Sequence, residues 1–220
     1  TYDKGLYTGA RYFYNNDDLV HKTDTHYTFV NMASIRVDGN ESNYSSSDGY
    51  NFFTDDGMTL FNKKGNEYNE SKGAWNLTAI PGVTNRQGQE NLKPISNWRG
   101  YCSKYNFAGA ATSSSKNAVA GYIHEKMNAS SKVNVNHKSG LNDPNPIIYD
   151  VRAHKSYFFM GDYMLALGAG VSNLNTSLEG NIWTTIDQTY WSDNITWGGN
   201  RKKGSISKTK KTFQKKLNNK

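Results

Sequence analysis

The stretch that decides the fold is IYDVRAHKSYFFMGDYMLALGAGVS, residues 148–172. It holds two long runs rich in aromatic and aliphatic residues, and Met160-Gly161-Asp162 separates them. A Gly beside an Asp between two such runs is typical of a β-hairpin turn. The stretch therefore predicts two long antiparallel strands joined by a tight turn.

Three further segments carry strand patterns. Residues 26–37, HYTFVNMASIRV, alternate so that both faces are partly apolar, as in a sheet that is covered on both sides. Residues 52–68 are typical of a strand, an Asp-Asp-Gly turn and a second strand. Residues 118–127 fit a helix or a strand by pattern, and their β-branched residues favour a strand. With eight to ten expected strands and no amphipathic helix, the sequence predicts an all-β fold, a large antiparallel β-sandwich.

Aromatic residues supply much of the expected core. Only 35% of the 220 residues are hydrophobic, yet aromatics make up 13%, with 15 Tyr, 9 Phe and 5 Trp. These side chains bury large areas and favour strands over helices. The composition therefore agrees with a sandwich built from aromatic and β-branched residues.

The net charge of +7 is a property of the C-terminal segment. Residues 201–220 hold nine of the 26 Lys and Arg residues and no acid, so the rest of the chain has 17 basic against 19 acidic residues. A basic tail can bind nucleic acid, but this tail lacks interleaved aromatics, and we expect a disordered terminus and no nucleic-acid partner. No apolar run approaches the roughly 18 residues of a membrane span, so we expect no membrane partner.

Metal ligands and disulfides are not indicated. Cys102 is the only cysteine, which excludes an internal disulfide. The five histidines show no HExxH or comparable ligand spacing. We therefore expect no cofactor, and nothing in the sequence indicates calcium.

Two groups of polar residues are candidates for a binding or supporting role. Glu41 and Asn43 follow the strand of residues 26–37, where a carboxylate and an amide can orient a base or bind a sugar hydroxyl. The alternative for this pair is a solvated loop. Asn85 and Arg86 follow a Pro-Gly turn, and Arg86 either pairs with a substrate carboxylate or is a surface charge.

Aromatic residues near the expected loops are the third candidate group. Sugar rings stack on exposed aromatic faces, whereas a core position is the alternative for each of these side chains. The group comprises Trp75, Trp98, Tyr101 and Tyr105.

Five segments resemble, in the same order, the central β-sandwich of polysaccharide lyase family 8, which includes hyaluronate, chondroitin and xanthan lyases. The similarity covers about residues 10–192, and two positions depart from the family pattern, Tyr157 where Trp is commoner and Asp187 where Glu is usual. The segments are YFYNNDDLVHKTDTHYTFVNMASIRV, NESNYSSSDGYNFFTDDGMTLF, NEYNESKGAWNLTAIPGVTNRQ, AHKSYFFMGDYMLALGAGV and IWTTIDQT.

The resemblance implies β-elimination on a uronic-acid-containing polysaccharide. In the family, a base removes the C5 proton, the carboxylate charge is neutralised and the 4-O leaving group takes a proton. Those roles belong to a helical toroid that this sequence lacks, so none is assigned to its own histidines or tyrosines. The sandwich supplies one glutamate, which by position is Glu41, five residues after Arg36, in a supporting role. The family's nearby asparagine falls close to Asn43.

The chain is therefore interpreted as a fragment of a lyase. Residues 1–197 are expected to form the central sandwich, and residues 198–220 a basic, disordered tail. Its expected partners are an anionic polysaccharide, such as a glycosaminoglycan, and the missing helical catalytic domain. We expect the chain to be inactive alone, and the parent protein to be secreted to the extracellular space or the periplasm.

Two other functions stay open. The first is a non-catalytic carbohydrate-binding module whose contacts come from Trp75, Trp98 and Arg86. The second is a self-sufficient lyase that uses a His/Tyr pair on a concave sheet face. It predicts a histidine within hydrogen-bonding reach of a tyrosine in an open groove.

Overall fold

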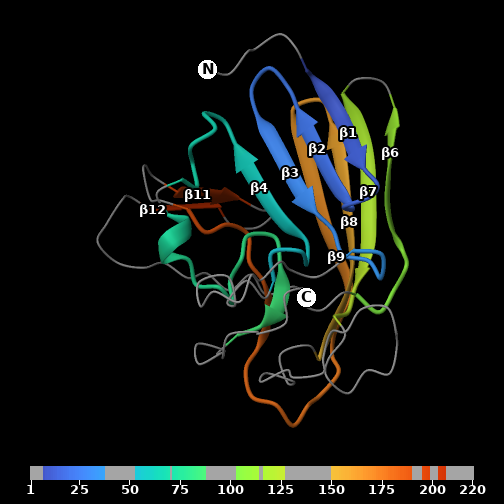
Figure 1. Cartoon of the computed structure of the whole chain (residues 1–220). Coiled ribbons are helices and arrows are strands. Elements are labelled where there is room, and N and C mark those ends of the chain that lie inside the picture. Colours follow the sequence, from blue (N-terminus) through green and yellow to red (C-terminus); the bar gives the residue numbers. More distant parts are fainter. Residues whose placement is uncertain are drawn as a thin grey trace.

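Two four-stranded antiparallel sheets face each other in this protein (Figure 1). The computed structural model describes residues 7–37, 53–69, 71–87, 103–113, 116–126, 150–189, 195–198 and 203–206. The first sheet has the order β1-β2-β3-β4, formed by Gly9–Phe13, Asp18–Lys22, Tyr27–Asn31 and Met58–Asn62. The second has the order β6-β7-β8-β9, formed by Ala108–Ser113, Asn117–His124, Val151–Met160 and Tyr163–Asn173. The predicted antiparallel sandwich is confirmed.

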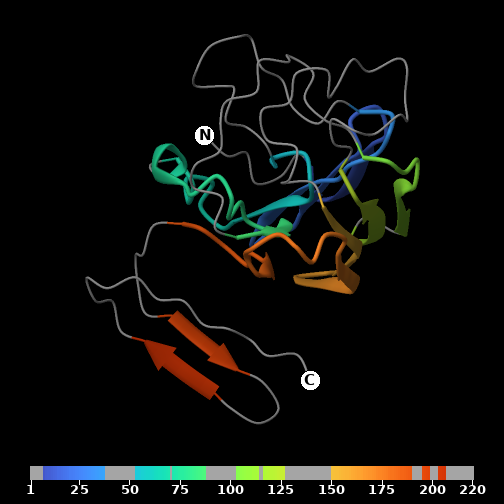
Figure 2. The same ribbon diagram turned by 90° about the horizontal axis from the view of Figure 1, so that it is seen from below.

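Four short strands complete the described elements. β5 (Thr84–Arg86) pairs with β10 (Ile182–Thr184), and β11 (Ile195–Gly198) pairs with β12 (Lys203–Ile206). Figure 2 shows the β11–β12 hairpin apart from the two large sheets. The expected boundary between residues 197 and 198 thus lies inside β11, and β12 lies within the predicted tail, whose residues 199–202 and 207–220 are outside the described part of the chain. A 3-10 turn, Lys72–Ala74, is the only helical element in the described part of the chain.

The β8–β9 hairpin confirms the prediction from residues 148–172. Met160 pairs with Tyr163, and Gly161 between them has a φ of 58°, a conformation that favours glycine in a two-residue hairpin loop. Alternate residues of β8 face the other sheet, which buries Tyr157 and Phe159 to 1% exposure. The turn at Gly161-Asp162 is therefore where the sequence predicted it, and the alternating burial along β8 defines the face that packs in the core.

The core lies between the two sheets. Leu19 and Val30 on the first sheet contact the buried row of β7 and β8, and all members of this cluster are at most 8% exposed. Complete burial of such a side chain contributes about 1.5–3 kcal/mol each. The cluster comprises Leu19, Val30, Met32, Ala33, Ala118, Ala120, Tyr122, Tyr157 and Phe159.

The outer face of the second sheet carries an exposed apolar row. Val119, Phe158 and Leu165 are cross-strand neighbours on β7, β8 and β9, and they are 41%, 37% and 45% exposed. β9 also forms one edge of the sheet. The described chain therefore leaves this face of the sandwich uncovered.

The strand predicted for residues 26–37 is shorter in the structure, where β3 ends at Asn31. Beyond it, the Met32 amide donates to the carbonyl of Asp17, and the Ile35 amide donates to the carbonyl of Tyr105. These partners do not belong to a neighbouring strand of the same ladder. Met32 and Ser34 stay buried past Asn31 without sheet pairing, because Met32 belongs to the core cluster and the Ser34 hydroxyl donates to Asp17 Oδ2.

The two strands predicted in residues 52–68 also differ. Residues 53–57 form turns and only β4 follows as a strand, because the Asp56 amide donates to the Phe53 carbonyl in a turn and the Gly57 amide donates to the carbonyl of Asn31 at the end of β3. The motif IWTTIDQT, residues 182–189, contains one described strand, β10, which has three residues. The twelve strands of the described residues exceed the predicted eight to ten because several are short.

Gly57 is the backbone position at which we expect a substitution to cost most. It has a φ of 94°, and a Cβ atom there would collide with the Tyr122 hydroxyl and lie 3.1 Å from the Tyr157 hydroxyl. Gly57→Ala should lower the free energy of unfolding by about 2–5 kcal/mol, through backbone strain and overpacking. Urea unfolding of the full chain measures this change.

Gly109→Ala is the matched control, because Gly109 lies in β6 and a Cβ atom there has no neighbour within 4 Å. This variant should keep its stability within about 1 kcal/mol. Equal losses in the two variants would contradict the steric argument for Gly57.

Candidate functional site

The predicted supporting residues lie outside the described part of the chain. Glu41 and Asn43 fall in residues 38–52, and Trp98 and Tyr101 fall in residues 88–102. The structure describes the chain up to Val37, and from Phe53 onward. The described residues on either side of these segments, such as Val37 and Phe53, therefore mark the part of the fold from which the candidate residues extend.

Arg86 lies in the interior, although both alternatives from the sequence placed it at the surface. It is 1% exposed, and its Nη2 donates to the Asn173 side chain at 2.6 Å. Its Nη1 donates to the carbonyl oxygens of Leu178 and Gly180 at 3.3 and 3.2 Å. The guanidinium thus joins β5 to the chain between β9 and β10, a position that does not fit contact with a substrate carboxylate.

Asn85 is buried beside it, at 1% exposure. Its Oδ1 accepts a hydrogen bond from Gln87 Nε2 at 3.0 Å, and its Nδ2 has no partner in the structure. Like Arg86, it lies within the fold and away from the surface that a polysaccharide would contact.

A buried cluster of charged residues lies at the end of β7, and we call it the Asp56 cluster. Asp56 Oδ2 accepts a hydrogen bond from Lys126 Nζ at 2.7 Å, and both side chains are 2% exposed. The Asp56 carbonyl accepts from the Tyr122 hydroxyl at 2.6 Å, and His124 Nδ1 lies 4.0 Å from Asp56 Oδ1. Breaking such a buried pair costs about 3–5 kcal/mol, so the cluster fixes this end of the sandwich.

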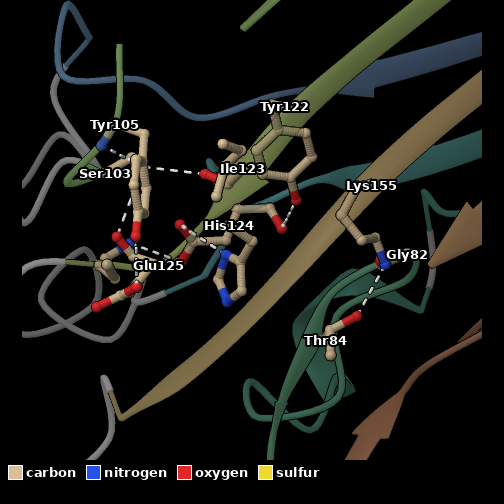
Figure 3. A network of polar contacts seen from close by, with 11 residues as sticks. Gly82, Thr84, Ser103, Tyr105, Tyr122, Ile123, His124, Glu125 and Lys155 are labelled. Carbon is tan, nitrogen blue, oxygen red and sulfur yellow. Dashed lines mark hydrogen bonds and ion pairs between the residues drawn. The ribbon is translucent and has the colours of Figure 1, made fainter. Parts of the chain in front are cut away.

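Glu125 extends the Asp56 cluster toward the surface (Figure 3). Its carboxylate accepts from Lys104 Nζ at 2.6 Å and from the Tyr105 hydroxyl at 3.1 Å. Arg152 Nη1 lies 3.9 Å away. Because Glu125 is 5% exposed, its charge is stabilised by these cations and not by solvent.

The ends of three segments outside the described residues meet at the Asp56 cluster. Ser103 and Lys126 form a β-bridge, and the Lys126 ammonium lies 6.0 Å from the centre of the Phe53 ring. The Ile35 amide bonds the carbonyl of Tyr105. The chain therefore enters or leaves residues 38–52, 88–102 and 127–149 from one edge of the sandwich.

Two carboxyl groups near this edge have raised pKa values. Burial raises the pKa of Asp55 to about 7, and burial also raises the pKa of Asp18 to about 6. Asn31 Nδ2 donates to Asp55 Oδ1 at 2.8 Å, and Asn31 pairs with Asp18 across β2 and β3. A carboxyl group with a pKa near 7 exchanges its proton under neutral conditions, as groups in proton-transfer sites do.

Lys155 is a further buried ionisable group. Its Nζ donates to Thr84 Oγ1 at 2.8 Å and to the Gly82 carbonyl at 3.1 Å (Figure 3). Burial lowers the pKa of Lys155 to about 8. The lysine joins β8 to the Pro81-Gly82 turn, so that turn is fixed by a polar contact from the core.

Tyr122 and His124 do not form the open catalytic pair that a self-sufficient lyase requires. Their ring centres are 6.3 Å apart, and the side chains are 1% and 4% exposed. Burial lowers the pKa of His124 to about 4. A neutral, enclosed imidazole is out of reach of a polymeric substrate.

Metal and membrane features were also sought within the described residues. No group of three or more His, Cys, Asp or Glu side chains in this part of the chain can hold a metal ion. No helix among these residues has the length and apolar character to cross a membrane.

The arrangement of strands is that of known polysaccharide lyases. A mutant of the chondroitin AC lyase of Streptomyces coelicolor A3 is 20% identical, with a TM-score of 0.62 over 88% of this chain and 22% of that one. A chondroitinase AC lyase is 22% identical, with a TM-score of 0.62 over 87% and 24%. A Paenibacillus xanthan lyase is 22% identical, with a TM-score of 0.56 over 77% and 14%. The chain thus spans less than a quarter of the length of these proteins.

The family follows from the sequence match. The model of polysaccharide lyase family 8, super-sandwich domain, matches residues 8–219. This chain belongs to polysaccharide lyase family 8 and corresponds to its super-sandwich domain. The resemblance inferred from the five motifs is confirmed, and the match includes most of the basic tail. No curated protein sequence matches the chain.

Sequence reasoning missed the Asp56 cluster. The available signal was the run His124-Glu125-Lys126, three ionisable residues directly after an alternating strand, together with Asp55-Asp56 in a turn. Each segment alone is typical of a solvated strand end. Only the pairing of Lys126 with Asp56, 70 residues apart, shows that their charges are buried together.

His124 should make the domain acid-sensitive. Because burial holds the pKa of His124 at about 4, below the ordinary value of 6.5, the folded state binds fewer protons than the unfolded state. The free energy of unfolding therefore has its full value above about pH 6.5, and it falls by about 3 kcal/mol as the pH falls toward 4. Urea unfolding of the chain and of His124→Phe at both pH values measures it.

Comparing the unmodified chain with His124→Phe isolates the contribution of His124. The titration of Asp55 and Asp18 changes stability with the opposite sign, but it does so in both proteins and cancels in the comparison. His154→Phe, which replaces an exposed histidine on β8, controls for the loss of an imidazole. A His124→Phe variant with the same pH dependence as the unmodified chain would contradict the assignment.

Proposed function

We propose that this chain is the central domain of a lyase that cleaves a uronic-acid-containing polysaccharide by β-elimination. The observation that carries the proposal is the match to the family's super-sandwich domain over residues 8–219. Two structural relatives add support for an anionic substrate: one was solved in complex with chondroitin sulphate, and another with oligosaccharides. A long polysaccharide is degraded outside the cytoplasm, so we propose that the parent protein acts in the extracellular space or the periplasm.

In the proposed reaction the C5–H and C4–O bonds break and a C4=C5 double bond forms. A base takes the C5 proton, and the leaving 4-oxygen takes a proton from an acid. We propose that a separate helical domain supplies these groups, together with the group that neutralises the uronate carboxylate. Within the described residues, the histidines nearest the core are enclosed, so none is assigned a catalytic role.

Glu41 and Asn43 are the residues through which we propose that this domain reaches the active site. The structure supports the proposal through Arg36, five residues before Glu41. Arg36 Nη1 donates to the side chain and carbonyl of Asn106 at 2.7 and 2.6 Å, and its Nη2 lies 2.5 Å from Asp17 Oδ1. The segment that carries Glu41 therefore starts from a fixed point on the rim.

The proposed supporting role predicts the effect of Glu41→Gln. The full chain should give no unsaturated uronate product from hyaluronan, chondroitin or xanthan, as followed by ultraviolet absorbance. Activity should appear when the family's helical catalytic domain is joined to its N-terminus. In that two-domain protein Glu41→Gln should lower kcat roughly 100-fold, because misplaced catalytic groups cost this much.

The matched control is Glu179→Gln, which makes the same change of charge at an exposed position elsewhere in the chain. Unchanged kcat in Glu41→Gln would contradict the supporting role. Binding of the polysaccharide by a two-domain protein that releases no product would favour the carbohydrate-binding module. Activity of the chain alone would favour a self-sufficient lyase.

A further inference from the structure

Two histidines lie next to each other at the end of the sandwich opposite the Asp56 cluster. His21 is in β2 and His26 directly precedes β3, so a four-residue turn separates them. Their ring centres are 5.8 Å apart, and they are 0% and 6% exposed. The proposed lyase function uses neither residue.

His21 has one satisfied and one unsatisfied ring nitrogen. Its Nε2 lies 2.9 Å from the carbonyl oxygen of Lys116, and a carbonyl only accepts, so Nε2 carries the hydrogen. In the neutral ring, Nδ1 then carries a lone pair and no hydrogen. This atom is buried and has no hydrogen-bond partner.

His26 shows the same division with the nitrogens exchanged. The Thr25 hydroxyl donates to Asp162 Oδ1 at 3.2 Å, so its oxygen accepts from His26 Nδ1, 3.1 Å away. Thr23 Oγ1 also lies 3.1 Å from Nδ1. In the neutral ring, Nε2 therefore carries the lone pair. This atom is also buried without a hydrogen-bond partner.

Among the described residues, neither lone pair receives a hydrogen bond, and the hydroxyl of Thr28, which pairs with His21 across β2 and β3, is also buried without a partner. The ring of Phe159 lies 4.9 Å from that of His21, and the ring of Phe61 stacks on His26 at 4.8 Å. Buried acceptors without partners are rare in native proteins, and they call for an ion or another ligand. An electron-pair acceptor between the rings would satisfy both nitrogens at once.

We propose that His21 and His26 bind one transition-metal cation of the class that prefers imidazole, such as Zn²⁺, through His21 Nδ1 and His26 Nε2. The outer contacts match those of metal-binding histidines, whose second nitrogen donates to a carbonyl or is linked to a carboxylate. His21 has the Lys116 carbonyl in this role, and His26 has Thr25 with Asp162.

Two protein ligands leave the coordination sphere of such a cation incomplete, and solvent completes it in the proposed site. No third His, Cys, Asp or Glu side chain completes a site among the residues that the structure describes. His26 lies directly below the exposed Thr25 and Asp162, which gives a short path from solvent.

Zinc titration of the full chain at neutral pH tests the site. Zn²⁺ should raise the Tm of the unmodified chain, and chelation should reverse the rise. At 100 times the Kd, the folding equilibrium constant should increase about 100-fold. His21→Gln and His26→Gln should each lose this dependence, whereas His154→Gln, at an exposed histidine, should keep it.

Imidazole ¹⁵N shifts of the unmodified chain give a second readout that does not depend on the variants folding. Zinc should shift Nδ1 of one histidine and Nε2 of another, in contrast to the uniform Nε2 binding of exposed rings. A Tm that does not respond to zinc, or that responds equally in all three variants, would overturn the proposal. So would a spectrum in which neither His21 nor His26 responds.

Discussion

The Asp17 carboxylate is the contact on which the geometry of the sandwich rim depends. Asp17 is fully buried and has a φ of 56°, which is uncommon for a residue with a side chain. Tyr12 and Arg36 bind its Oδ1, and Ser34 donates to its Oδ2. One charge thus joins β1, the β1–β2 turn and the segment after β3. These contacts hold residues 32–36 after sheet pairing ends at Asn31, together with the backbone bond from Ile35 to Tyr105.

The sandwich has two ends with different chemistry. The register of β2 and β3 places Asp18 opposite Asn31 at one end and Lys22 opposite Tyr27 at the other. The first end collects buried charges, and it contains Phe53 and Ser103, the residues that follow the segments with Glu41 and Trp98. The second end collects two imidazole side chains whose ring centres are 5.8 Å apart. The antiparallel fold separates the rim proposed to face a catalytic partner from the proposed metal site by the length of the strands.

The sequence predicted the fold well, because alternation along a strand depends only on which face is buried. The Gly-Asp turn between two apolar runs in residues 148–172 predicted β8 and β9, and the β-branched residues of 118–127 predicted β7. The positions of Arg86, Lys126 and Lys155 were out of reach. Each is a cation in a strand or turn pattern, and its burial depends on acceptors 70 to 87 residues away, such as Asn173 for Arg86. The motif resemblance identified Glu41 as a candidate, but it did not predict which residues surround it.

Buried cations also explain how a chain with 35% hydrophobic residues closes two sheets. Arg86, Lys126 and Lys155 place long alkyl stems in the interior, and their charged ends take up carbonyl, hydroxyl and carboxylate oxygens that would otherwise be unpaired. The pairing has strict geometry, because an unpaired buried charge costs several kcal/mol. Apolar packing alone would tolerate small shifts of one sheet on the other. The polar contacts do not, so they fix the rim from which the proposed active-site residues extend.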